Sequence, residues 1–348
     1  MDKYEKRREK ELSSKSLYQY IRVLIKFKEW AESKEGLNPF LMYHADKKLI
    51  SQYVDYLQAN KYKNVTIEDN HLSVLNSLFE FATSVGEYDD IPSPAKGHKL
   101  KATKEELADK IPREPFTEED LNRIFNYELL KKNGNPCFYW LPILALYTGA
   151  RINELSQLTI LDISKIEGID VIHITDENGG KVKTNASRRT IPLHPQVIKL
   201  GFLDYVADVK KYGHMVFPNL IKDKFGSYGK EPSRRFGEHL DKIGITSRSK
   251  VFHSFRGTAN NHLKQKGVSV EERNDMIGHE NEGTNERHYS KKYDAKYLYE
   301  NVLPKLDFKV DFSKFSYEKD MFHVFIAKRL RNLRERDKRE KQKANSTT

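Results

Sequence analysis

The sequence predicts a mainly α-helical protein of two domains, with one small β-hairpin in the second domain. Apolar side chains recur at helical spacing along most of the chain, whereas strand-like residues gather between positions 171 and 193. A stretch rich in Pro, Gly and Lys divides the 348 residues. We therefore expect a helical domain over residues 1–104, a linker to about residue 113, a second domain over 114–302 and a basic tail over 303–348.

The first domain is expected to contain three helices, over residues 13–34, 49–60 and 66–85. Ser13 and Ser14 open the first helix, because short hydroxyl side chains accept hydrogen bonds from the free N–H groups of a first turn. Thr66 and Asp69 are the predicted cap of the third helix. Lys and Arg residues occupy the outer faces of these helices.

The second domain opens with a helix capped by Thr117, with Asp120 at the position that reaches back to the cap. The apolar run 137–147 predicts a buried helix. The hairpin is formed by strands at residues 171–174 and 189–193, with a turn at Asn178-Gly179-Gly180. Further helices are expected over residues 195–210, 233–243, 254–266 and 270–277.

The charge balance favours an anionic partner, most often a nucleic acid. The chain has 61 Lys and Arg against 50 Asp and Glu, a net charge of +11 and a pI of about 9.3. The alternative is a basic protein without such a partner. The single cysteine, Cys137, excludes a disulfide framework and a cysteine-based zinc site, and its apolar neighbours predict core packing.

Several other classes of protein are not supported. No apolar run approaches the roughly 18 residues of a membrane span. The charged N-terminus does not resemble a signal peptide, so we expect an intracellular protein. No P-loop motif is present.

The end of the chain is strongly basic. Residues 328–343 hold nine Lys and Arg against three acids. Such a run is either a solvated helix or disordered tail, or an arm that binds nucleic acid or a protein partner.

Three short motifs carry candidate chemistry. In TGARINEL, residues 148–155, Arg151 follows an apolar helix and requires an anion, which is either Glu154 or a phosphate. In HSFR, His253 and Arg256 are three residues apart, so they share a face if a helix starts there. His279 follows a glycine at the end of another apolar helix.

Tyr289 lies ten residues after His279. A tyrosine hydroxyl titrates at pH ~10, so it acts as a nucleophile only beside a proton acceptor and positive charge.

The order of these motifs resembles that of the tyrosine recombinase, or phage integrase, family. TGARINEL matches the TGxRxxEL box at every fixed position, HSFR matches HxxR, and IGH differs from LGH only by Ile277. The nucleophilic tyrosine of the family usually follows that histidine by nine or so residues, so Tyr293 is the alternative to Tyr289, with Tyr297 and Tyr299 after it. The resemblance covers roughly residues 13–300.

The resemblance implies a helical, SAM-like core-binding domain followed by an α/β catalytic domain. It implies a site-specific integrase that cuts and rejoins DNA through a 3′-phosphotyrosyl intermediate, without metal, ATP or another cofactor. The implied catalytic residues are Arg151, Lys183, His253, Arg256, His279 and the nucleophile Tyr289.

The same resemblance assigns roles to these residues. Arg151 and Arg256 hold the non-bridging phosphate oxygens, His253 exchanges the tyrosine proton and His279 donates a hydrogen bond to the phosphate. The hairpin lysine protonates the leaving 5′-oxygen; Lys183 fits the KT…RR…PL pattern better than Lys181 does. Arg188 and Arg189 are expected to contact the DNA backbone, and Glu154 is expected to orient Arg151.

The implied partners are double-stranded DNA attachment sites, other copies of the chain in a tetramer on DNA, and possible accessory factors that bend DNA or set direction. Such an enzyme integrates or excises a mobile element in the cytoplasm, on the nucleoid, and is bacterial or phage-encoded; no membrane is involved. Residues 297–302 are a candidate docking helix for a neighbouring protomer, with intramolecular packing as the alternative. About a dozen residues precede the first helix, so no separate arm-binding domain is expected.

Three other functions fit part of the pattern. A type IB topoisomerase shares the chemistry but relaxes supercoils without site preference. A DNA-binding accessory protein with a decayed site is a second alternative. A metallohydrolase built on His253, His279 and His288 is a third, although no HExxH motif is present.

Overall fold

The computed structural model describes residues 2–34, 36–88, 91–109, 111–280 and 291–345. The chain divides into two compact units, Met1–Ile111 and Pro112–Thr348. Within the described ranges, no helix has both the length and the apolar character that crossing a membrane requires.

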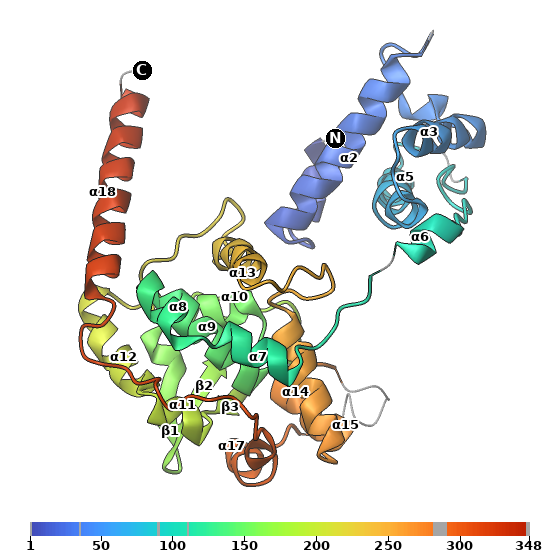
Figure 1. Ribbon diagram of the computed structural model, residues 1–348. Coiled ribbons are helices and arrows are strands. Elements are labelled where there is room, and N and C mark those ends of the chain that lie inside the picture. The colour runs from blue at the N-terminus through green and yellow to red at the C-terminus, as the bar shows by residue number, and fades with distance from the viewer. Residues whose placement is uncertain (1, 35, 89–90, 110, 281–290, 346–348) are drawn as a thin grey trace. The chain divides into compact units, whose positions relative to one another are not determined.

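Unit 1 is all helical (Figure 1). Its helices are α1 (Asp2–Arg8), α2 (Ser14–Glu32), α3 (Lys47–Ala59), a continuous helical stretch of α4 (Asn64–Thr66), the π-helical η2 (Ile67–Leu72) and α5 (Ser73–Ser84), and α6 (Lys104–Ala108). The three predicted helices are therefore confirmed. Ser13 caps α2, since its side chain accepts a hydrogen bond from the Ser16 N–H at 3.2 Å.

The core of unit 1 is rich in aromatic rings. Phe27 and Trp30 of α2 contact Tyr53 of α3, with ring centroids 4.9 and 5.0 Å apart. All three are buried, as is Phe79 of α5. Large rings at helical spacing thus hold the three main helices together.

The predicted cap of the third helix is wrong. This helix starts at Asn64 rather than Thr66, and its N-cap residue, Lys63, provides no side-chain cap. Instead, Glu106 of α6 accepts a hydrogen bond from the Asn64 N–H, and the Lys101 carbonyl accepts one from the Asn64 side chain. Part of the expected linker therefore packs onto unit 1.

Unit 2 surrounds one buried helix with other helices and a small sheet (Figure 1). Its helices are α7 (Glu118–Ile124), α8 (Tyr127–Asn133), α9 (Pro136–Thr148), α10 (Ile152–Ser156), α11 (Pro195–Lys199), α12 (Phe202–Val209), α13 (Lys230–Lys242), α14 (Ser254–Gln265), α15 (Val270–Ile277), α17 (Ala295–Tyr297) with the turns η6 (Leu298–Val302) and η7 (Leu303–Lys305), and α18 (His323–Asn345). The predicted capping box of Thr117 and Asp120 is confirmed at the start of α7.

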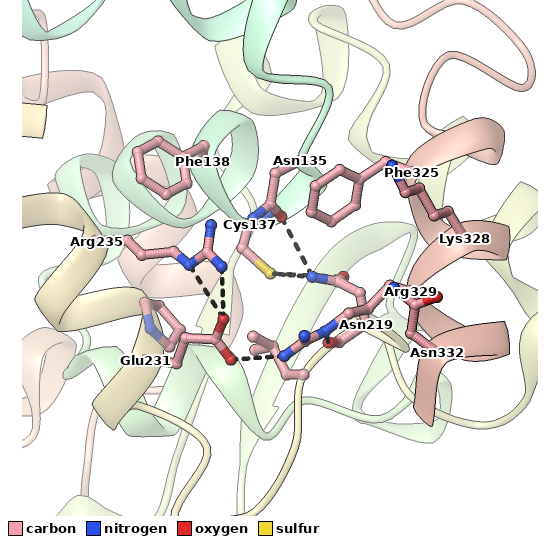
Figure 2. Close-up of a pocket in the computed structure, with 12 residues that line it drawn as sticks. Asn135, Cys137, Phe138, Asn219, Glu231, Arg235, Phe325, Lys328, Arg329 and Asn332 are labelled. Carbon is pink, nitrogen blue, oxygen red and sulfur yellow. Dashed lines mark hydrogen bonds and ion pairs between the residues drawn. The ribbon is translucent and has the colours of Figure 1, made fainter. Parts of the chain in front are cut away.

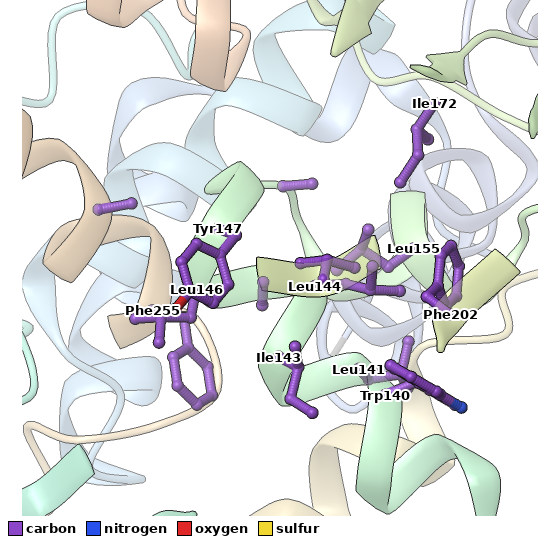
Figure 3. Packing of buried hydrophobic residues seen from close by; sticks show 14 of the residues in the cluster. Trp140, Leu141, Ile143, Leu144, Leu146, Tyr147, Leu155, Ile172, Phe202 and Phe255 are labelled. Atoms are coloured by element: carbon purple, nitrogen blue, oxygen red, sulfur yellow. The ribbon is translucent and has the colours of Figure 1, made fainter. Parts of the chain in front are cut away.

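Helix α9 is the centre of this unit. Its side chains are apolar on all sides and almost all buried, and the helix packs against α14, α10, α13 and α8. Figure 3 shows part of this packing, with Leu155 of α10 and Phe255 of α14 among the neighbours of α9. Cys137 is buried near its start, as expected. A helix without a polar face is stable only when it is enclosed, so α9 fixes the positions of the helices around it.

The sheet has three antiparallel strands in the order β1 (Ile163–Ile166), β2 (Ile169–Ile174) and β3 (Arg189–Pro192). β2 and β3 confirm the predicted hairpin, with Ile172 opposite Ile191. β1 was not predicted, because its side chains are mostly exposed. It pairs with β2 through a two-residue turn, Glu167-Gly168, in which both residues have positive φ, as a type I′ turn requires.

Residues 303–326 contribute to the core of unit 2. They cross unit 2 as an extended segment between α17 and α18 (Figure 1). Their apolar side chains are buried in the main cluster: Leu303, Leu306, Phe312, Phe315, Phe322 and Ile326. These residues lack helical spacing, so the composition alone did not predict their burial.

Candidate active site

The TGARINEL segment forms the turn from α9 into α10. Gly149 ends α9 in the left-handed region at φ 61°, and an added Cβ there would lie 2.7 Å from Ile277 Cγ2. Glycine is therefore needed both for the turn and for the close approach of the end of α15. Arg151 follows as the N-cap residue of α10.

Glu154 holds Arg151 in two ways. Its Oε2 accepts a hydrogen bond from the Arg151 backbone N–H at 2.9 Å, and its Oε1 forms an ion pair with Arg151 Nη1 at 2.6 Å. Nη1 also donates to Ser187 Oγ. The Arg151 side chain is 27% exposed, and its Nε and Nη2 make no hydrogen bond to the described residues. The arginine is thus fixed, with donors left for a ligand.

Arg256 is buried in the first turns of α14. Its guanidinium donates to the carbonyl oxygens of Gly149 (3.0 Å), Ile277 and Gly278 (3.1 Å). Its Nε also donates to His279 Nε2 at 3.2 Å. One side chain thereby joins the end of α9 to the end of α15.

Arg189 is buried in the same site. Its side chain is 1% exposed and forms an ion pair with Glu154 Oε2 at 3.0 Å. It also donates to the carbonyl oxygens of Met276 and Ser187. An added Cβ at Gly278 would lie 2.6 Å from Arg189 Nη1, so that glycine makes room for it. Arg189 is therefore a buried partner of Glu154 in this structure, and its expected contact with DNA stays a prediction.

The site carries positive charge that its own acid does not neutralise. The guanidinium groups of Arg151, Arg189 and Arg256 surround one buried carboxylate, that of Glu154. Burial lowers the pKa of Arg256, and the charges of Arg151 and Arg189 lower it further. Three cations against one anion in a partly desolvated site favour binding of a further anion.

The surroundings of both motif histidines lower their pKa values and so favour the neutral imidazole. His253, at the N-cap of α14, has its pKa lowered by partial burial and then by Arg256 and Arg151. The same causes, burial first, lower the pKa of His279 to about 4. A neutral imidazole has one N–H donor and one acceptor. His279 Nε2 accepts from Arg256, so its Nδ1–H is available to donate.

The two loop lysines differ in their contacts. Lys181 Nζ donates to the Phe225 carbonyl at 3.1 Å, and the Lys181 backbone is held by Gln157. Lys183 is exposed two residues further on, in the β2–β3 loop. Arg188 is also exposed, and it forms a paired contact with Asp176 at 2.7 Å.

The expected nucleophile, Tyr289, lies outside the described residues. The alternatives Tyr293 and Tyr297 stack with ring centroids 4.3 Å apart, next to α15. Burial and the acids Glu271, Glu272 and Asp275 raise the pKa of Tyr293, and a hydrogen bond to Glu272 raises that of Tyr297.

The candidate docking helix instead packs within unit 2. Leu298 and Val302 are 1% and 0% exposed in the core cluster. The alternative of intramolecular packing is therefore confirmed for these two side chains.

Two supporting residues were not found from the sequence. Asn153 Oδ1 accepts hydrogen bonds from Ser227 Oγ and from the N–H groups of Tyr228 and Gly229. Lys292 Nζ donates to the carbonyl oxygens of Ala186 and Arg188, beside the hairpin loop. Their partners are distant in the sequence, so no local pattern marked them.

Comparisons with known proteins agree with this geometry. The Phage integrase family model matches residues 115–296, and the model of the phage integrase N-terminal SAM-like domain matches residues 5–86. A search of curated protein sequences finds no significant match. Within the described residues, no group of three or more His, Cys, Asp or Glu is placed to hold a metal ion.

Three solved structures share the fold at low identity. XerH site-specific recombinase bound to difH substrate is 18% identical, covers 82% of this chain and 77% of its own, and has a TM-score of 0.53. A lambda integrase dimer bound to a COC′ core site is 18% identical, with 84% and 96% covered and a TM-score of 0.54. The Tn1549 transposon integrase in complex with a circular intermediate DNA is 16% identical, with 84% and 94% covered and a TM-score of 0.56.

The family model spans more than half of the chain, and it covers the TGARINEL, HSFR and IGH motifs. Neither the topoisomerase nor the accessory-protein alternative is favoured by these matches. The chain belongs to the phage integrase family and is an enzyme of the tyrosine site-specific recombinase type.

Proposed function

We propose that this recombinase cuts and rejoins DNA through the site formed by α10, α14, the end of α15 and the β2–β3 loop. The observation that carries the proposal is the clustering of Arg151, Arg256 and neutral His279 with more positive than negative charge. A phosphodiester is an anion with two non-bridging oxygens, so it matches planar guanidinium donors.

The reaction begins when the Tyr289 oxygen attacks the scissile phosphorus. The bond from phosphorus to the 5′-oxygen breaks, which leaves a 3′-phosphotyrosyl link and a free 5′-hydroxyl. Rejoining is the reverse attack by a 5′-hydroxyl, so the bond energy is retained and no nucleotide cofactor is required. Tyr289 is preferred because Tyr293 and Tyr297 lie beside acids that oppose ionisation of a phenol.

Arg151 and Arg256 would bind the non-bridging oxygens. Negative charge on these oxygens increases in the transition state, and both guanidinium groups are already held by Glu154 or by backbone carbonyls. Preorganised donors of this kind stabilise the transition state without rearrangement. His279 would donate Nδ1–H to the same phosphate.

Proton transfer is assigned to His253 and Lys183. His253 lies at the start of α14, reaches solvent and has a lowered pKa that favours its neutral form, so it can accept the tyrosine proton. Lys183 would donate a proton to the leaving 5′-oxygen. Lys181 is less suitable, because its amine is already bonded to the Phe225 carbonyl.

The partners are proposed from the DNA-bound relatives. The lambda integrase has been solved as a tetramer bound to a Holliday junction, and this chain has the same fold at 18% identity. We propose that four copies assemble on paired attachment sites on bacterial or phage DNA, within the nucleoid. Arg188 would contact the DNA backbone, and accessory factors would set the direction of recombination.

A nicked suicide substrate tests the nucleophile. Such a duplex, carrying an end of the element that encodes the protein, loses a short fragment after cleavage and traps the covalent adduct. Tyr289→Phe should form no adduct, whereas the matched control Tyr293→Phe should form as much as the wild type. Adduct from Tyr289→Phe together with none from Tyr293→Phe would show that Tyr293 is the nucleophile.

A second substrate tests the lysine. A 5′-bridging phosphorothiolate has a thiolate leaving group that needs no proton. Lys183→Met should cleave the ordinary substrate slowly and the phosphorothiolate normally, and Lys181→Met should cleave both normally. Slow cleavage of both substrates by Lys183→Met would exclude the proposed role.

A further inference from the structure

Helix α18 is attached to unit 2 through its first turns. Phe322 precedes it and Ile326 lies in its first turn, and both are buried in the core. Arg329 forms an ion pair with Glu231 of α13 at 3.0 Å and donates to the Asn219 carbonyl (Figure 2). Glu231 also binds Arg235, so one carboxylate joins two arginines from two helices.

The rest of α18 is exposed. Apart from the partly buried Leu333, residues 331–343 have exposed side chains, and the helix extends from the rest of unit 2 as a rod (Figure 1). This part contains no buried apolar side chain among the described ones, so packing does not explain its composition.

The exposed part has a basic stripe. Arg331, Arg334, Lys338 and Lys341 are spaced by three, four and three residues, so they share one face of the helix. At about 1.5 Å per residue the stripe is about 15 Å long. None of the four forms an ion pair with a described residue, whereas Arg336, on another face, pairs with Glu340 at 3.5 Å.

The anchored end of α18 lies at the opposite end of α9 from the active-site residues. α18 is anchored beside Asn135 and Cys137 at the start of α9, and the active site begins at Gly149, after the end of α9. The 13 residues of α9 separate these two places by about 20 Å, which is about six base pairs of duplex.

We propose that this stripe binds the phosphate backbone of duplex DNA at a distance from the scissile phosphate. The inference rests on the proposed function for the presence of DNA at the site. A row of cations without an apolar or aromatic anchor suits a phosphate backbone and lacks the buried core of a protein interface. The contact would raise affinity and salt dependence without reading sequence.

The experiment compares two faces of the same helix. One full-length variant replaces Arg331, Arg334 and Lys338 by glutamine, and the control variant replaces Arg336, Arg339 and Lys343 by glutamine. Both lose three charges. Binding to a random-sequence duplex of about 40 base pairs is measured over a range of salt concentrations. Far-UV circular dichroism checks that α18 remains helical.

The stripe variant should bind about 10- to 100-fold more weakly, with a salt slope smaller by about 2 to 3, and the control should change less. At saturating protein, both should form adduct on the suicide substrate at the wild-type rate. Equal losses of DNA affinity in the two variants would show that the effect comes from net charge alone, and would overturn the proposal. Normal DNA binding with failed pairing of two sites would assign the stripe to a second copy of the chain and also overturn it.

The two proposals fail in different ways. Wild-type protein that binds duplex but never forms an adduct would contradict the proposed chemistry. The comparison of the two helix faces would still decide whether the stripe binds DNA.

Discussion

Replacing Arg189 by methionine distinguishes a buried support of the active site from a DNA contact. Methionine keeps much of the volume and removes the charge. Glu154, itself only 4% exposed, would lose the partner 3.0 Å from its Oε2, and two carbonyl oxygens would lose their donor. Breaking a buried ion pair from one side destabilises a protein by about 3–5 kcal/mol. For a unit of this size, that lowers the melting temperature by about 6–20 °C.

Thermal and urea unfolding measure this loss, and a double-mutant cycle identifies its origin. Adding Glu154→Gln to Arg189→Met removes the unpaired carboxylate, so part of the lost stability should return. Cleavage should not return, because Arg151 also loses its ion pair with Glu154. Unchanged stability of Arg189→Met, combined with a salt slope of DNA binding smaller by about one, would restore the DNA contact and refute the buried role.

Three further predictions concern stability. Gly149→Ala should destabilise unit 2 by about 2–4 kcal/mol, because the new Cβ strains the backbone and overlaps with Ile277. The control is Gly134→Ala, at a glycine with a similar φ and open space around it; in the same unfolding assay it should show only the loss of stability that comes from backbone strain. Asn153→Ala leaves three donors of residues 227–229 without their acceptor, so urea unfolding should show a loss of about 1–3 kcal/mol; no loss would exclude that role. Burial lowers the pKa of His71 and of His194 to about 4, so the unfolded chain binds these protons more tightly. The contribution of each neutral histidine to folding stability is complete above the usual pKa of about 6.5 and decreases as the pH falls towards 4. The protein should therefore unfold at a lower urea concentration at pH ~5 than at pH ~7. His194→Gln should make this difference in stability between the two pH values smaller.

Local sequence patterns were sufficient for the elements that local physics determines. α2, α9 and α14 follow from apolar spacing or from a continuous apolar run, and Ser13 and Thr117 cap their own helices. The start at Asn64 was not predictable in this way, because its acceptor, Glu106, is 42 residues away. The burial of the segment after residue 303 likewise depends on the surface that α9 and α12 present to it.

Within the active site, two arginines also show that local sequence patterns do not predict contacts with residues that are distant in the sequence. Arg188 and Arg189 are adjacent and identical in the sequence, yet one side chain is 48% exposed and the other 1% exposed. Alternation along a strand places them on opposite sides. The inward one is tolerated because Glu154 and two backbone carbonyls pair with it, since an unpaired buried guanidinium would be strongly destabilising.

In the eight residues of TGARINEL, some structural features depend on neighbouring residues and others depend on residues that are distant in the sequence. Thr148 donates to the Leu144 carbonyl and accepts from the Ala150 N–H, so the end of α9 is specified locally. Three other residues have partners that are distant in the sequence. Gly149 lies against Ile277, Asn153 accepts hydrogen bonds from residues 227–229, and Glu154 pairs with Arg189. Arg151 retains donors for an anion because these neighbours fix the backbone and take only part of its guanidinium. A substitution at any of these supporting positions should therefore weaken the binding of an anion by Arg151, although Arg151 itself is unchanged.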